Sequence, residues 1–132
     1  MKKLLYLGLG IVLMFASCGA NESSTVNLDG REVSTIKIDN LEVMTEDLGK
    51  MRWDDAMKAC ADLGDGWRLP TIDEMSKLLY KNKEKIGGFA QAQYWTSPEF
   101  DTNLAWFEIF YKGNQNARNL SNVLYVRAVR DF

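Results

Sequence analysis

The chain has 132 residues, 46% hydrophobic and 26% charged, so it resembles an ordinary globular protein and can bury one core without disulfides or metals. It contains no histidine, which removes the commonest general base and the commonest metal ligand from its chemistry. The net charge is −2 and becomes about −4 (14 basic against 18 acidic residues) once a leader with two lysines is removed, so we expect no nucleic-acid partner.

The N-terminus has the organisation of a signal peptide. Residues 2–15 are two lysines followed by an apolar run that is too short for a membrane span, which needs about 20 residues. The small residues 16–17 directly precede Cys18, a pattern that resembles the lipobox at which bacterial lipoproteins are cleaved and acylated, although position 15 is Phe instead of the usual Leu. The alternative is a secretory signal with an incidental cysteine.

These features predict three regions. Residues 1–17 are expected to be a lipoprotein signal peptide, residues 18–25 the lipidated cysteine with a flexible polar tether, and residues 26–132 the folded domain. Palmitate or a similar acyl chain on Cys18 would hold the protein outside the cytoplasm, on a membrane of the cell envelope, which we take to be the outer membrane.

Strand patterns open the domain. Residues 26–28 and 33–38 alternate apolar and polar side chains on either side of Asp29-Gly30, which is a hairpin signal. Residues 41–48 form a third predicted strand.

A first helix is predicted from Trp53. Trp53, Met57, Cys60 and Leu63 recur at steps of three and four residues, which places them on one helix face. Gly64 or Gly66 can end the helix. Cys60 would be the only thiol of the mature chain. Its place on the apolar face favours a buried structural cysteine over a reactive one.

A second helix is predicted from a capping box. Thr71 and Glu74 have the spacing at which each side chain bonds the other residue's backbone N–H, and Pro70 keeps the preceding chain extended. Residues 72–79 then carry an apolar stripe. Trp67, in the connection between the helices, is expected to plug the core.

A charged segment, residues 81–85, follows the second helix before Gly87-Gly88 breaks the structure. Its lysines are suited to a helix C-terminus, where they complement the helix dipole. Binding of phosphate or glycan by these lysines is the alternative.

The last third of the sequence predicts strands. Residues 94–97 begin one strand, and residues 104–111 are apolar on both faces, as in a strand covered on both sides. Residues 113–122 read as a polar loop, and residues 123–129 as a closing strand whose arginines point outward or pair with acids. Strands, two helices and strands again predict an α+β fold, with two helices packed on a mainly antiparallel sheet.

Several motifs together carry a family resemblance. They are Trp53-Asp54-Asp55-Ala56, Gly66-Trp67-Arg68-Leu69-Pro70-Thr71 with Glu74, Tyr94-Trp95-Thr96-Ser97, Ala105-Trp106, Gly113 and Val126-Arg127-Ala128-Val129-Arg130. Over residues 41–132 they resemble the Lcl C-terminal domain family, a bacterial surface module of largely unknown function. That family is similar in fold to C-type lectins and to the formylglycine-generating enzymes, so the resemblance implies a C-type lectin-like fold with a twisted sheet.

The resemblance informs fold more than function. The residues that we assign to structure are Trp53, Trp67, Arg68, Pro70, Thr71 and Glu74. Arg68 is expected to pair with a buried acid or with strand carbonyls.

A calcium site is not expected. C-type lectins that bind sugar through calcium use a Glu-Pro-Asn or Gln-Pro-Asp loop and a Trp-Asn-Asp strand, and residues 97–99 and 106–108 match neither. Glu99, Asp101 and Asn103 offer some of the roughly six to eight oxygens that calcium requires. Acids that alternate in a loop are more often solvated, so we predict no metal.

Catalysis is not expected either. The formylglycine-generating enzymes use cysteines in the C-terminal part of the domain, and this chain has none after Cys60. It has no Ser-His-Asp set and no glycine-rich phosphate loop. The acid pairs Asp54/Asp55 and Asp62/Asp65 lie near helix ends, where acids are common. We therefore predict no enzyme activity and no cofactor.

Non-catalytic binding of a glycan or a protein remains, through the loops at 98–104 and 112–122. Polar side chains there are suited to adaptable hydrogen bonding, although a simple connecting loop has the same composition. The candidate ligand-binding residues are Glu99, Asp101, Asn103, Lys112, Asn114, Gln115, Asn116, Arg118, Asn119 and Asn122.

Nearby aromatic residues could assist such binding. Tyr94, Trp95, Trp106 and Tyr111 could stack on a sugar ring or anchor a protein, but core packing is the more ordinary role for aromatics in strands. The alternatives to a binding protein are a structural or assembly component of an envelope complex, and a diverged enzyme of the formylglycine-generating type.

Overall fold

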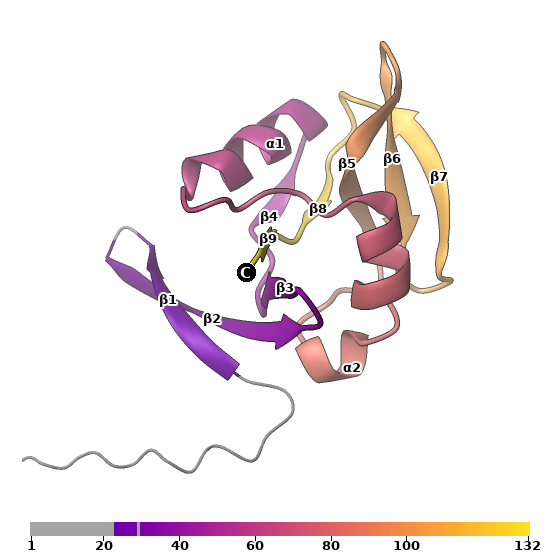
Figure 1. The fold of residues 1–132 in the computed structure, drawn as a ribbon. Helices are drawn as coiled ribbons and strands as arrows, with labels where there is room; N and C mark the ends of the chain where they lie inside the picture. The colour runs from indigo at the N-terminus through magenta and orange to yellow at the C-terminus, as the bar shows by residue number, and fades with distance from the viewer. Residues whose placement is uncertain (1–22, 29) are drawn as a thin grey trace, which may run out of the picture.

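The computed structural model describes residues 23–28 and 30–132 (Figure 1). The predicted signal peptide, Cys18 and residues 19–22 lie outside the described residues. The described elements are β1 (Ser23–Leu28), β2 (Arg31–Ile38), β3 (Leu41–Met44), β4 (Gly49–Met51), α1 (Trp53–Asp62), η3 (Glu74–Leu79), α2 (Lys83–Ile86), β5 (Gln93–Asp101), β6 (Leu104–Ile109), β7 (Asn114–Asn119), β8 (Leu124–Val126) and β9 (Val129–Asp131). None of the described helices is long and apolar enough to cross a bilayer.

A four-stranded antiparallel sheet joins the two ends of the domain. Its strand order is β1-β2-β3-β9, so the C-terminal strand pairs with the third strand of the chain. The predicted hairpin is confirmed: β1 and β2 pair from Leu28 opposite Arg31 outward, and Gly30 takes the positive φ of +82° that such a turn requires. Residues 23–25, which we expected in the tether, belong to β1.

A five-stranded sheet has the order β4-β8-β5-β6-β7. It is antiparallel except where β5 and β8 run parallel. β5 is the middle strand, and β6 lies between β5 and the edge strand β7. Residues 114–119 are therefore a strand and not the predicted loop. In Figure 1 the β5–β6 hairpin reaches the top of the view, far from the start of β1 at the lower edge.

Each face of the five-stranded sheet has its own core. On one face, Trp53 and Cys60 of α1 pack in an apolar cluster with Trp95 of β5. On the other, Leu79 of η3 packs in a second cluster with Tyr94 of β5. The α+β class is thus confirmed, with helices on a mainly antiparallel sheet.

The first helix runs as predicted, over Trp53–Asp62. Cys60 is completely buried, and this burial raises the pKa of its thiol to about 12, as expected for a structural cysteine. Met57 departs from the predicted apolar face, since it is 37% exposed.

The second helix is irregular. The capping box is confirmed, because the Glu74 N–H donates to the Thr71 hydroxyl (3.1 Å) and the Thr71 N–H donates to a Glu74 carboxylate oxygen (2.9 Å). The helix that follows is a short π-helical segment, η3, in which the Tyr80 N–H bonds the Met75 carbonyl (2.8 Å).

Arg68 ties the capping box to the C-terminal strand. Its guanidinium donates to both Glu74 carboxylate oxygens (2.8 and 2.9 Å) and to Asp131 (3.0 Å), and its backbone exchanges hydrogen bonds with Val129. Burial alone would raise the Glu74 pKa, but the bonds from Arg68 and Thr71 outweigh it and hold that pKa below its ordinary value. Arg68 therefore pairs with an acid, which is one of the two predicted roles.

Removing this guanidinium should lower stability. We expect Arg68→Ala to reduce the free energy of unfolding by about 1–2 kcal/mol, a value discounted because the side chain is one-third exposed. Urea denaturation measures it, with Arg52→Ala, which removes an exposed arginine, as the control. Equal stability of the two variants would contradict the structural role of Arg68.

The predicted closing strand is divided between the two sheets. β8 pairs with β4 in the five-stranded sheet, and β9 pairs with β3 in the other, so the chain changes sheets at Arg127 and Ala128. Both arginines of this stretch pair with acids and neither points into solvent: Arg130 bonds Glu42 (2.9 Å), and Arg127 is fully buried beside Asp47.

Candidate functional site

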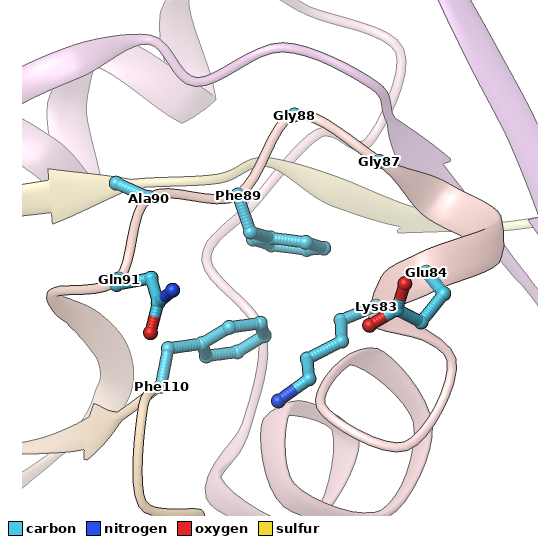
Figure 2. A pocket seen from close by; sticks show the side chains of 8 residues that line it. All are labelled: Lys83, Glu84, Gly87, Gly88, Phe89, Ala90, Gln91 and Phe110. Carbon is cyan, nitrogen blue, oxygen red and sulfur yellow. The ribbon is translucent and has the colours of Figure 1, made fainter.

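An open hollow of about 340 Å³ lies beside Gly87 and Gly88, where the chain leaves α2 (Figure 2). We call it the Phe89 hollow. Its lining residues are Lys83, Glu84, Gly87, Gly88, Phe89, Ala90, Gln91 and Phe110. Of these, only Lys83 was considered for binding, as the alternative function of the lysines in residues 81–85. The others come from α2, from an irregular segment and from the residue after β6, which the fold alone brings together.

Arg127 shapes the wall of this hollow. Its guanidinium donates to Asp47 (2.8 Å) and to the carbonyls of Met44 (2.8 Å) and Gly87 (3.1 Å). It also stacks on Phe89, with the guanidinium carbon 3.9 Å from the ring centre. One buried cation thus fixes the main chain at Gly87 and the ring that follows.

A second connection fixes Ala90. The Ala90 N–H donates to the Tyr94 hydroxyl (2.7 Å), which in turn donates to Asp47 (2.8 Å). Burial, helped by Asp47, raises the Tyr94 pKa, so the hydroxyl keeps the proton that it donates. Asp47 therefore holds both ends of the segment, through Arg127 at Gly87 and through Tyr94 at Ala90.

Gly88 allows the close packing of this segment. Its φ of +75° is one that side chains rarely adopt, and a Cβ there would collide with the Thr45 carbonyl oxygen and lie 3.2 Å from an Arg127 nitrogen. The predicted chain break at Gly87-Gly88 is confirmed, and it lets the chain pack against Thr45 and Arg127.

The hollow combines aromatic rings with polar groups. The Phe89 and Phe110 rings lie 4.3 Å apart, and the Lys83 ammonium is 4.1 Å from the Tyr80 ring centre. Figure 2 shows the Lys83 amine turned toward Phe110, with Gln91 and Glu84 on opposite sides of the hollow. Apolar rings with a few amine, amide and carboxylate groups are typical of sites for small polar ligands.

A smaller hollow of about 260 Å³ adjoins the same segments, and Tyr111 and Val123 lie in its wall. Both are about half exposed. Of the aromatic residues proposed as sugar-stacking candidates, Tyr94 and Trp95 are buried in the core, whereas Tyr111 is available to solvent.

Four of the predicted binding residues gather at the end of the β5–β6 hairpin. Asn119 pairs with Leu104, next to Asn103, and the Leu120 N–H donates to the Asn103 carbonyl. Their side chains are largely occupied in turns: Asp101 accepts from the Asn103 N–H, and Asn119 accepts from Ser121. The four residues are Asp101, Asn103, Asn119 and Asn122.

Two further predicted residues adjoin this group, since Glu99 and Arg118 each pair with Ala105. The remaining residues lie farther along the sheet: Asn114 and Asn116 are exposed on β7, and Lys112 lies beyond the opposite end of that strand. Gln115 faces the other way and donates to the buried Glu108 (2.8 Å). The structure does not bring the ten residues into one site, and neither hollow includes any of them.

No group of three or more His, Cys, Asp or Glu side chains in the described part of the chain is placed to hold a metal ion.

Glu108 is a buried acid within the strand that the sequence predicted to be apolar on both faces. One carboxylate oxygen accepts from Ser76 (2.9 Å) and Gln115 (2.8 Å), and the other has no partner in the described structure. Burial raises the Glu108 pKa, and the two hydrogen bonds only partly oppose the effect.

This raised pKa gives a pH-dependent stability. A carboxyl group whose pKa is higher in the folded state than in the unfolded state stabilises the fold fully below its unfolded pKa. This stabilisation is lost as the pH rises through the folded pKa. We therefore expect Glu108→Gln to match the wild type near pH 4 and to become progressively more stable than it toward pH 8. Urea denaturation at several pH values measures this, with Glu99→Gln, an exposed acid, as the control. Parallel profiles of wild type and Glu108→Gln would contradict the expectation.

Comparison with known families agrees with the sequence motifs. The family model of the Lcl C-terminal domain matches residues 21–130, so the chain belongs to the Lcl C-terminal domain family. A search of curated proteins found no match.

Proposed function

We propose that the chain is a lipid-anchored extracytoplasmic protein whose Lcl C-terminal domain binds a glycan without catalysis. The Phe89 hollow carries this proposal. A sugar ring presents apolar C–H groups to aromatic side chains and hydroxyl edges to amine, amide and carboxylate groups. The hollow offers the half-buried Phe89 for the first kind of contact, whereas Phe110 is buried. For the second kind it offers Lys83, Gln91 and Glu84.

The anchor is proposed from the signal-like N-terminus and Cys18, on the outer membrane of the envelope. Radiolabelled palmitate should enter the wild-type chain and not Cys18→Ser. Label in both forms would contradict acylation at this cysteine.

A C-type lectin-like arrangement is the finer fold that we propose. In a C-type lectin-like fold the terminal strands of the domain pair. The pairing of β9 with β3 supports this arrangement, because it places the C-terminal strand in the same sheet as the N-terminal hairpin.

A glycan array probed with residues 19–132, with and without EDTA, tests the binding. We expect reproducible binding to one sugar class, lost on Gln91→Ala, an exposed residue of the hollow. The control combines Asn114→Ala, Asn116→Ala and Asn119→Ala on the β7 edge, and should bind as the wild type does. A blank array with folded protein would overturn the glycan proposal, and EDTA sensitivity would indicate calcium.

A protein partner is a second candidate, in the assembly of an envelope complex. Phe100 is 53% exposed at the β5–β6 hairpin and packs edge-on against Trp106, with ring centres 5.1 Å apart. Aromatic side chains, Phe among them, are enriched in the cores of protein–protein interfaces. Loss of a co-purifying envelope protein on Phe100→Ser, with glycan binding unchanged, would support this candidate.

A further inference from the structure

The end of the four-stranded sheet at which β1 begins also carries α2. Ser23, the first residue of β1, pairs with Ile36 near the end of β2. Ile36 packs in one apolar cluster with Ile86 of α2. In Figure 1 the start of β1 and α2 both lie at the lower edge of the view, opposite the β5–β6 hairpin. The chain therefore enters the domain beside α2.

Lysines outnumber acids within residues 81–85 at this end, whereas the exposed Asp39 and Asp131 lie near the β2–β3 turn and Phe132. Lys81 and Lys85 are exposed, Lys83 is half-buried, and Glu84 is the only acid among residues 81–85. This lysine segment has a net charge of +2 (three lysines against one glutamate), although the mature chain as a whole is acidic.

An aromatic residue lies at the same end of the sheet. Phe132 is 59% exposed, and the Lys37 ammonium lies 4.7 Å from its ring centre. The Phe132 N–H is 3.4 Å from the Asn40 carbonyl, in the turn that joins β2 to β3. Lysines beside an exposed Phe are the combination that surface-bound protein segments present to lipid headgroups.

The distance to the anchor is short. Five residue steps separate Cys18 from Ser23, so the chain between them reaches at most about 18 Å. An acyl group on Cys18 would keep the start of β1, and the lysine segment beside it, near the membrane surface. Anionic headgroups attract lysines that come within about 8–10 Å, the screening length at physiological salt.

We propose that the exposed Lys81 and Lys85 of the lysine segment, with Phe132, hold the domain against anionic lipid headgroups of the membrane that anchors it, so that the β5–β6 hairpin points away from the bilayer. This rests on the acylation of Cys18 proposed above. It gives these two lysines after the second helix a function beyond complementing a helix end. Lys83 instead faces the Phe89 hollow.

Hydrogen–deuterium exchange of the full mature lipoprotein tests this orientation. The acylated protein is inserted into nanodiscs of phosphatidylcholine alone or of phosphatidylcholine mixed with phosphatidylglycerol. We expect amides of residues 81–86 to exchange several-fold more slowly on the anionic discs, and high salt to remove the difference. The variant Lys81→Gln/Lys85→Gln should lose it, whereas the equally charged control Lys50→Gln/Lys58→Gln, on β4 and α1, should keep it.

Different results would overturn the contact with lipid headgroups and the acylation of Cys18 on which it rests. Acylated protein on the discs with no lipid-dependent change at residues 81–86, or with the same change in both double variants, would remove the contact with lipid headgroups and leave the anchor. A chain that carries no acyl group and stays off the discs would overturn the anchor itself, and the contact with it.

Discussion

Arg127→Ala is expected to lower the free energy of unfolding by about 3–5 kcal/mol, because it leaves Asp47 largely buried without its cation. It also frees the Met44 and Gly87 carbonyls and removes the surface on which Phe89 stacks. Urea denaturation followed by tryptophan fluorescence measures the loss.

The matched variant is Asp47→Asn with Arg127→Met. It retains an acceptor for the Tyr94 hydroxyl and leaves no buried charge, so much of the lost stability should return. A loss below about 1 kcal/mol for Arg127→Ala, as for a surface ion pair, would show that this arginine is not the buried clamp described here.

Gly88→Ala is expected to cost about 2–4 kcal/mol and to distort the Phe89 hollow. A positive φ strains any side chain, by about 1–3 kcal/mol, and at this position the new methyl group also meets the Thr45 carbonyl, which cannot move cheaply. Thermal unfolding and urea denaturation measure the change.

Gly64→Ala separates the two causes. Gly64 has the same φ of +75°, but nothing lies within 4 Å of a Cβ there, so that variant should show the strain alone. If the two variants lose equal stability, the close approach of Gly88 to Thr45 contributes nothing.

Local signals in the sequence predicted local structure well. The Thr71–Glu74 capping box, the Asp29-Gly30 hairpin and the helix from Trp53 each depend on residues within a few positions of one another. Such patterns specify backbone geometry without knowledge of the rest of the fold.

β7 could not be predicted in this way. Its sequence, Asn-Gln-Asn-Ala-Arg-Asn, has no apolar alternation, and its strand conformation comes from pairing with β6 along the whole strand. The same pairing turns Gln115 toward Glu108 and leaves Asn116 exposed, so the polar segment does not act as one surface.

The candidate site depends on still longer separations. In the sequence, Arg127 is an arginine within a predicted strand. Only the fold shows that its ion-pair partner is Asp47, 80 residues earlier. The ring partner of Phe89, Phe110, comes from the end of a different strand. The break at Gly87-Gly88 was visible in the sequence, but the hollow that it permits was not.

Mapping of ligand-induced shifts in ¹⁵N–¹H NMR spectra tests the central proposal most directly, with the glycan that gives the strongest array signal as the titrant. We predict the largest shifts at Lys83, Gly87–Gln91 and Phe110, and small ones elsewhere. Large shifts confined to residues 99–104 and 119–122, with the Phe89 hollow unchanged, would contradict it and place binding at the polar hairpin end.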